Sequence, residues 1–184
     1  MRSRYEIRPG ATAMIRERKG GFRMPTSVTA ALERGDIRPG VSVFDYGEGF
    51  GETCEHLRND YGVACRGWDK FHAARKPKIP SDVVTLNFVL NVVPDPAERR
   101  EALQEAFSLA RRSLVIGVRG RQDERSTKTK IPWGDGYRVR QQGKWTFQKF
   151  YTPDAVVRYI RRVLGRSAKI RLLRRDPVVV VVDR

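Results

Sequence analysis

The sequence is poor in the residues that build metal sites. Its 184 residues include two cysteines, Cys54 and Cys65, and two histidines. The cysteines stand 11 positions apart without a C-x-x-C pair, and His56 falls on a different helical face from Cys54. Zinc ligands need closer convergence than this. We therefore expect no metal site, and we expect both thiols to be small buried residues.

Long apolar runs are absent as well. No stretch approaches the roughly 20 consecutive apolar residues of a membrane-spanning helix. The basic start of the chain, residues 1–4, is not followed by the apolar segment of a secretory signal. These absences predict a soluble, cytoplasmic protein with no membrane partner, and the length suits a single domain.

Acidic residues are in short supply. The chain has 21 Asp and Glu against 37 Lys and Arg, which gives a formal net charge of +16. An excess of this size attracts polyanions over long distances, so nucleic acid is the first candidate partner. The alternative is an arginine-rich composition that only keeps the surface solvated.

Glycine is concentrated in one informative stretch. The apolar run 41–44 leads into Asp45, Tyr46 and three alternate glycines, and a helix-like segment follows. This order predicts a strand, a tight turn and a helix. Glycine lets the chain reverse and a ligand approach the backbone, and free N–H groups at the helix start suit a polar or anionic ligand. The glycines are Gly47, Gly49 and Gly51.

An acidic residue follows at the distance expected of a nucleoside site. A second apolar strand over 63–68 ends in Asp69, which is 24 residues after Asp45. An acid in this place accepts hydrogen bonds from the hydroxyls of a ribose. The plainer alternatives are a buried turn that binds nothing and a solvated loop carboxylate. Together, the turn and the acid at this spacing favour a nucleoside cofactor.

The pattern Asp45-x-Gly47-x-Gly49-x-Gly51 resembles motif I of the Rossmann-like methyltransferases that depend on S-adenosylmethionine (SAM). The resemblance implies SAM as the cofactor, with Asp45 near its methionine end, the glycines beneath it and Asp69 on its ribose. The cofactor-binding residues implied in this way are Asp45, Tyr46, Gly47, Gly49, Gly51, Trp68, Asp69 and Asn87.

Further segments are similar to one group within this class, the methyltransferases found with bacterial DNA phosphorothioation systems. The similarity runs from about Met14 to the C-terminus. One difference is Glu48, which stands between the first two glycines where that group has a small residue or cysteine. Its carboxylate would repel the carboxylate of SAM or pair with the ammonium group. The similar segments are 45–47, 67–69, 82–84, 87–93, 95–99 and 146–152.

Two regions are expected along the chain. Residues 1–25, with seven Lys or Arg and two Glu, predict a basic N-terminal arm, and residues 26–184 a methyltransferase-like domain. Thr26 or Ser27 is expected to cap the first helix and Asp95 a later one.

Apolar runs alternate with helical segments in the domain. They predict an α/β fold, namely a doubly wound, mostly parallel sheet with helices on both faces and a C-terminal antiparallel hairpin. The 12 residues 70–81 are too few for a crossover helix and strand, so the third strand is expected to be absent or abbreviated. After this loop the apolar run 82–93 is expected to supply a central strand that ends near Asn87, and further strands are expected over 113–118, 168–173 and 178–182.

Two asparagines follow the central strand. Ligands of open α/β sheets bind outside the carboxyl ends of the strands, which makes Asn87 and Asn91 candidates for contact with cofactor or substrate. The alternative is that backbone groups satisfy both amides.

The segment 119–150 interrupts the alternation. It holds nine Lys or Arg and three acids, with aromatic residues scattered between them. Basic groups hold phosphates while aromatic faces stack on bases. The expected substrate-binding residues are Asn91, Lys130, Trp133, Tyr137 and Arg138. The alternative, strongest for Phe147 and Phe150, is that the aromatic residues anchor a long loop to the core.

We therefore expect a SAM-dependent methyltransferase that acts on nucleic acid or on a DNA-associated protein. Transfer of the methyl group needs alignment and desolvation, so no side-chain nucleophile is compulsory. The chain has no Asp/Asn-Pro-Pro-Tyr run and no Pro-Cys pair, which disfavours exocyclic base amines and cytosine C5 as targets. One alternative is a non-catalytic nucleic-acid-binding module with the same fold. A nicotinamide-dependent oxidoreductase is a weaker one, because no Lys, Tyr or His is placed as a clear proton donor.

Overall fold

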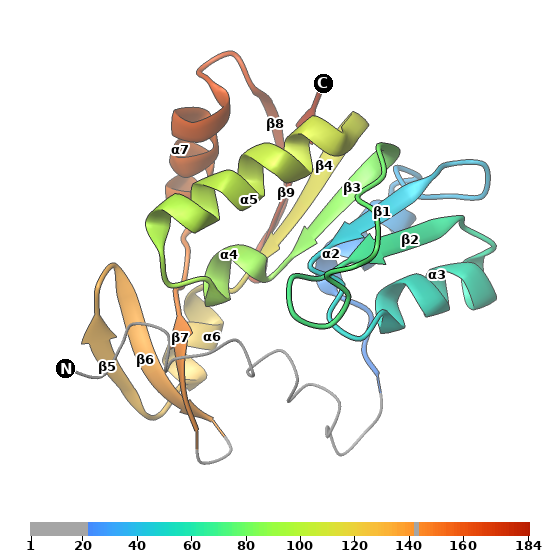
Figure 1. Ribbon diagram of the computed structural model, residues 1–184. Helices are drawn as coiled ribbons and strands as arrows, with labels where there is room; N and C mark the ends of the chain where they lie inside the picture. Colours follow the sequence, from blue (N-terminus) through green and yellow to red (C-terminus); the bar gives the residue numbers. More distant parts are fainter. Residues whose placement is uncertain (1–21, 142–143) are drawn as a thin grey trace.

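The computed structural model of the chain describes residues 22–141 and 144–184 (Figure 1). Most of the basic arm predicted over 1–25, including Arg16, Arg18 and Lys19, lies outside the described residues. Within those residues, no helix has the length and apolar character needed to cross a membrane.

A six-stranded sheet forms the centre of the molecule. Neighbouring strands pair in parallel from β2 through β1 and β3 to β4, and β9 runs antiparallel between β4 and β8. This confirms the predicted mostly parallel sheet with a C-terminal antiparallel hairpin. In spatial order the strands are β2 (Cys65–Trp68), β1 (Val43–Tyr46), β3 (Ser81–Asn87), β4 (Ala110–Val118), β9 (Val178–Asp183) and β8 (Lys169–Arg175).

The third strand is absent, as predicted. In the described part of the chain, β2 pairs with β1 alone and its outer edge has no partner strand. The chain passes from β2 to β3 through the loop 69–80, which contains only turns and irregular structure. One edge of the sheet is therefore left to this loop.

Helices cover both faces of the sheet (Figure 1). Alternate residues along each buried strand point to opposite faces, so the core has two parts. Phe44, Val84 and Ile116 pack under α4, α5 and α7, whereas Val43 and Val115 pack under α2 and α3. The helices are α2 (Thr26–Glu33), α3 (Glu52–Tyr61), α4 (Val89–Val92), α5 (Pro96–Leu109) and α7 (Pro153–Leu164).

The N-terminal cap predicted for α5 is confirmed, and the cap predicted for α2 is wrong. The Asp95 side chain accepts a hydrogen bond from the Ala97 N–H, and proline follows at the first helical position of α5. For α2, however, Pro25 is the N-cap and makes no side-chain cap, and Thr26 is already helical. The Ser27 hydroxyl is used elsewhere, because it donates to the Asn87 side chain at 2.5 Å.

The basic and aromatic insert expected over 119–150 contains secondary structure within the described residues. It forms the short helix α6 (Arg121–Ser126) and a second, antiparallel sheet of β5 (Lys130–Trp133), β6 (Gly136–Gln141) and β7 (Lys144–Gln148). We call these three strands the insert sheet. A two-residue Gly134-Asp135 connection joins β5 to β6, and Gly134 adopts the positive φ that such hairpin turns need. In Figure 1 the insert sheet lies beyond α4 and α6, at the end of the molecule where β1 and β3 end.

Candidate functional site

The carboxyl ends of β1, β2 and β3 meet at one edge of the sheet, where the glycine turn leads from β1 into α3. Gly47 has a φ of 86°, and a Cβ there would lie 2.4 Å from Val89 Cγ2, so no other residue fits. Gly49 has a φ of 59°, but a Cβ there would meet nothing within 4 Å. The turn is thus closed against α4 at Gly47 and open at Gly49.

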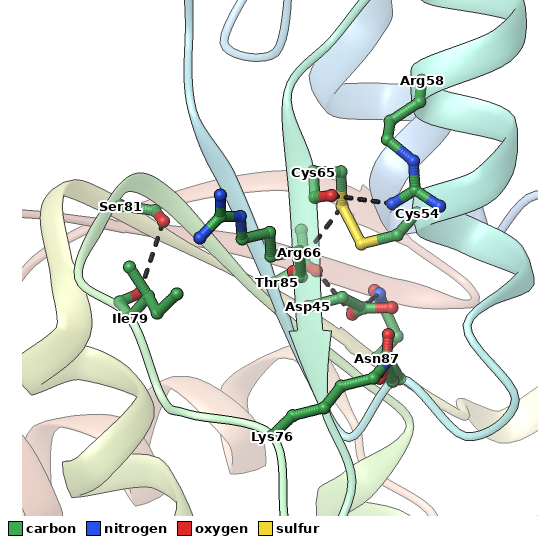
Figure 2. The surroundings of a disulfide bond; sticks show 11 residues. Asp45, Cys54, Arg58, Cys65, Arg66, Lys76, Ile79, Ser81, Thr85 and Asn87 are labelled. Atoms are coloured by element: carbon green, nitrogen blue, oxygen red, sulfur yellow. Dashed lines mark hydrogen bonds and ion pairs between the residues drawn. A yellow bond between two sulfur atoms is a disulfide. The ribbon is translucent and has the colours of Figure 1, made fainter. Parts of the chain in front are cut away.

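Asp45 is a buried acid at the end of β1. Its carboxylate is 2% exposed, and Oδ1 accepts hydrogen bonds from Thr85 Oγ1 at 2.6 Å and Asn87 Nδ2 at 2.9 Å. Figure 2 shows these three residues together. Burial, opposed by these hydrogen bonds, raises the pKa of Asp45 to about 6. The carboxylate therefore changes charge close to physiological pH.

Asn87, a predicted cofactor ligand, connects this acid to α2. Its Nδ2 donates to Asp45, and its Oδ1 accepts from the Ser27 hydroxyl. The Asn87 amide is therefore held in one orientation beside Asp45. The hydroxyl of Ser27 was not recognised from the sequence, where it was interpreted as a helix cap.

Asp69, the predicted ribose ligand, is 6% exposed at the end of β2. Its Oδ1 accepts from the N–H groups of Phe71 and His72, at 2.8 and 2.9 Å, and its Oδ2 accepts from the Gly49 N–H at 3.1 Å. A carboxylate has about four acceptor positions. One acceptor position on Oδ2 therefore remains for a hydrogen bond from a ligand. A second would become available if the Gly49 N–H donated to a ligand and not to Asp69.

Tyr46 and Trp68 are placed differently from the prediction. Tyr46 is a core residue whose hydroxyl donates to Glu105 of α5 at 2.5 Å, and burial raises its pKa. The half-buried Trp68 lies against Tyr46, and its Nε1 donates to the Ala74 carbonyl oxygen. These side chains fix the loop and α5 beside the site.

Glu48 points neither to solvent nor to the opening at Gly49. Its side chain is 3% exposed and pairs with Lys76 of the loop, with 2.5 Å between Oε1 and Nζ. It also lies directly over Gly67 of β2, where a Cβ would be 2.4 Å from Glu48 Oε2. We expected this carboxylate to act on the cofactor. Instead it holds the loop that stands in place of the third strand.

Three lysines tie this loop to the rest of the domain. Lys70 pairs with Glu98 and Lys78 with Glu105, each at 2.6 Å, and Lys76 pairs with Glu48. Lys78 also lies 3.9 Å from the centre of the Trp68 ring. Most of the loop is exposed, and its lysines are the groups that attach it.

A cavity of about 350 Å³ opens along the outer edge of β2, between α3 and this loop. Cys54 and Cys65 both line it, and they form a disulfide with 5.0 Å between their Cα atoms (Figure 2). The prediction of two free, buried thiols is therefore wrong with respect to bonding, although both residues are buried. The reason is that the glycine turn lays α3 over β2, which brings two distant positions together.

Asn91, predicted to bind substrate, is fully buried in α4. Its Nδ2 donates to the Lys149 carbonyl oxygen, and its Oδ1 accepts from the Arg119 N–H at 3.0 Å. Both ends of the side chain are thus occupied by backbone groups at the two stems of the insert. The structure assigns Asn91 to holding the insert and not to substrate contact.

The insert sheet separates the aromatic residues that we expected to act together. Trp133 pairs with Gly136 and Tyr137 with Pro132, so the two side chains lie on opposite faces. Tyr137 donates to Glu124 of α6, whereas Trp133 packs edge-on against Phe147.

The remaining insert residues divide in the same way. Lys130 shares the face of Tyr137 and donates to the Glu124 carbonyl oxygen, whereas Arg138 is on the face of Trp133. Phe147 is 2% exposed and anchors the insert, as the alternative interpretation held. Phe150 lies against Tyr137.

A buried arginine joins α5 to the insert. Arg99 is 1% exposed and pairs with Asp135 in the β5–β6 turn, and its guanidinium lies over the Phe147 ring. Lys149 pairs with the same carboxylate at 2.9 Å. The two cations hold the pKa of Asp135 below its usual value, although burial opposes them. This connection was not visible in the sequence.

No protein-family model and no curated protein matches the sequence. Solved structures do match. The sugar N-methyltransferase KedS8 from Streptoalloteichus is 14% identical, with a TM-score of 0.62 over 95% of this chain and 92% of that one. The chain has a methyltransferase fold. At this level of identity the likeness establishes the arrangement of the elements and nothing of the substrate.

Two further methyltransferases were solved with the cofactor or its product. The magnesium protoporphyrin IX methyltransferase of Synechocystis, with bound SAM, is 15% identical, with a TM-score of 0.53 over 97% of this chain and 92% of that one. The 1,6-didemethyltoxoflavin N1-methyltransferase of Burkholderia thailandensis, with bound S-adenosylhomocysteine, is 14% identical, with a TM-score of 0.55 over 86% and 76%.

Proposed function

We propose that the chain binds SAM at the carboxyl ends of β1, β2 and β3 and transfers its methyl group to a nucleic-acid acceptor. The observation that carries this proposal is the pair of buried acids, Asp45 and Asp69, on either side of a glycine turn that is open at Gly49. Two structures with the same fold, 14 and 15% identical to this chain, hold SAM or its demethylated product.

The residues present fit a SAM molecule. Asp69 retains an acceptor position for a ribose hydroxyl, and the free space at Gly49 admits the cofactor against the backbone. Asp45, whose charge is poorly solvated, would be stabilised by the ammonium group at the methionine end. Glu48 does not obstruct this arrangement, because its charge is already paired with Lys76.

Methyl transfer requires the protein to position the methyl donor and the acceptor. When bound, SAM would supply an electrophilic methyl carbon on its sulfonium, for a lone pair of the acceptor to bond as the carbon–sulfur bond gives its electrons to sulfur. The chain's residues hold the two partners in line and exclude water, and a proton leaves the acceptor to solvent. Asn87 contributes by keeping Asp45 oriented through the Ser27 contact.

Nucleic acid is proposed as the methyl acceptor because of the positive charge of the chain. The net charge is +16, and the insert 119–150 alone has nine Lys or Arg against three acids. The resemblance to methyltransferases of phosphorothioation systems would make DNA, or a cytoplasmic protein that works on DNA, the target. A non-catalytic nucleic-acid-binding module is the second candidate, and the missing third strand favours it because the cofactor site has a loop for one wall.

Calorimetric titration tests the proposal directly. SAM and S-adenosylhomocysteine should bind and NAD should not. Asp69→Asn should weaken SAM binding by on the order of 1.5–3 kcal/mol, since a charge-assisted hydrogen bond is lost while the side chain keeps its size. Asp60→Asn, an exposed acid on α3, is the matched control and should change nothing. Absence of SAM binding to the folded protein would favour the non-catalytic module, and NAD binding would favour an oxidoreductase.

A further inference from the structure

One face of the insert sheet is basic and aromatic. Residues directly opposite each other on paired antiparallel strands share a face. Ile131 pairs with Arg138, Arg138 with Phe147, and Arg140 with Trp145, so these five side chains lie on one face together with Trp133. We call it the aromatic face. None of the residues that the register places on this face is acidic.

The two ends of the aromatic face have different surroundings. At one end Phe147 is buried against Trp133 and Arg99. At the other end the side chains reach solvent: Ile131 is 51% exposed, Arg140 is exposed and Trp145 is half-buried. The aromatic face is therefore attached to α5 at one end and open at the other.

The charges on the open end are not neutralised within the described residues. Neither Arg138 nor Arg140 has an ion pair there; Arg138 lies 5.2 Å from the Trp145 ring. The acids of the insert are engaged elsewhere: Asp135 pairs with Arg99 and Lys149, Glu124 accepts from Tyr137, and Asp123 accepts from the Gly120 N–H. An exposed apolar surface with uncompensated cations suits a polyanion that also has flat apolar faces.

The opposite face of the sheet is closed. Val139, Thr146 and Gln148 there are between 0% and 3% exposed. Lys130 and Tyr137, on the same face, are bonded to Glu124 of α6. With respect to the described residues 22–141 and 144–184, the aromatic face is thus the one that has room for a ligand.

We propose that the aromatic face binds single-stranded nucleic acid, with a base stacked on Trp145 and with phosphates on Arg138 and Arg140. Bases of a single strand can lie flat on an aromatic side chain, whereas those of a duplex are stacked on each other. This inference rests on the proposed function, which supplies nucleic acid as the methyl acceptor. Asn91 and Arg99 fix the insert to the end of the sheet where the proposed cofactor site lies.

Fluorescence anisotropy with a labelled oligothymidylate, about 15 nucleotides long, measures this binding in the absence of SAM. Affinity should fall with salt, with a log–log slope of about −0.7 for each phosphate neutralised. Arg140→Gln should lower the magnitude of the slope by about 0.7, and Arg158→Gln, an exposed arginine of α7, should leave it unchanged.

The stacking contact has its own variants. Trp145→Ala should weaken binding about tenfold without changing the salt slope, and Trp145→Phe should restore most of the loss because it keeps an aromatic face. Tyr61→Ala, an exposed aromatic of α3, is the matched control. Circular dichroism shows whether each variant folds. If Trp145→Ala fails to fold, Arg140→Gln still tests the proposal.

Three results would overturn the proposal: no binding of the single strand by wild type at low salt, tighter binding of a matched duplex, or equal losses in the control variants. Calorimetry with SAM on the same samples separates the two proposals. A protein that binds SAM but no single strand lacks this surface, and one that binds the single strand but no SAM lacks the proposed activity.

Discussion

The proposed cofactor site and the aromatic face lie at the same end of the molecule, but the charged groups of the first are buried and hydrogen-bonded whereas those of the second have no ion pairs among the described residues. Asp45 and Asp69 are 2% and 6% exposed, and hydrogen bonds from the protein hold both. In contrast, Arg140 is exposed and Arg138 half-buried, and neither has an ion pair among the residues described. Buried and oriented groups select one small ligand in a fixed pose, whereas exposed cations attract a polymer and respond to salt.

Asp45→Asn should have the largest effect on SAM binding and should sharpen this contrast. The difference between the ordinary pKa of 3.8 and about 6 corresponds to about 3 kcal/mol of unfavourable burial at neutral pH. Asparagine keeps the oxygen that accepts from Thr85 and Asn87. We expect the free energy of unfolding to rise by about 1–3 kcal/mol in urea denaturation, with SAM affinity lost and nucleic-acid binding intact. Lower stability together with retained SAM affinity would contradict both roles of this carboxylate.

The pH dependence of wild type follows from the same group. A raised pKa means that the folded state binds the proton more tightly, so the Asp45 contribution lowers stability as pH rises from about 4 to about 6. SAM affinity should change in the opposite sense and weaken below pH 6, because the protonated acid no longer attracts the ammonium group. Calorimetry on either side of pH 6 measures the affinity of wild type, and urea denaturation over the same pH range measures its stability; the Asp45 part of the stability slope should disappear in Asp45→Asn.

Asn91→Ala tests whether the two regions are separable. The side chain is fully buried and serves one carbonyl and one N–H, so its loss leaves two backbone groups without a partner. We expect about 2–4 kcal/mol of destabilisation and faster hydrogen exchange at the Arg119 N–H. Asn59→Ala on the exposed side of α3 is the control. If SAM binding changed as much as stability, the cofactor site and the insert would be one unit.

The central sheet was predictable from the sequence because its inner strands lie within apolar runs that leave few alternatives, although the edge strands β2 and β8 carry exposed arginines. The glycine turn, Asp45 and Asp69 could be placed for a related reason, since each lies at the end of such a run. The loss of the third strand followed from counting residues 70–81, because chain length limits what can be built.

The rest depends on contacts between distant positions. Lys76 is 28 residues from Glu48, and Cys54 and Cys65 meet only because α3 lies over β2. The strands of the insert are short and mostly polar, so hydrophobic periodicity does not mark them. A Gly134-Asp135 pair between two short runs was the one local signal of the hairpin. Without the register, Trp133 and Tyr137 could not be assigned to opposite faces.

Gly67→Ala should have an intermediate effect, on the cofactor side of the comparison. The new methyl group would lie 2.4 Å from Oε2 and 2.7 Å from Cβ of Glu48, too close for a small shift to relieve. We expect about 1–2 kcal/mol of destabilisation. In a Glu48→Ala background the same change should cost little, which gives a coupling energy of at least about 1 kcal/mol. Additive effects in the double variant would show that Glu48 does not occupy the space over β2.

Tyr137→Phe should have the smallest effect on stability and on nucleic-acid binding. It is informative because Tyr137 and Trp145 lie on opposite faces of the insert sheet. The change removes one hydrogen bond, from the Tyr137 hydroxyl to Glu124 at 2.9 Å, at a half-buried position on the closed face of the insert sheet. Stability should therefore change by no more than about 0.5 kcal/mol. Binding of the oligothymidylate should be unchanged, because the phenyl ring remains and faces away from the aromatic face. A loss as large as that of Trp145→Ala would move the nucleic-acid surface to the face that carries Tyr137 and Lys130, and the contrast between a closed and an open face would fail.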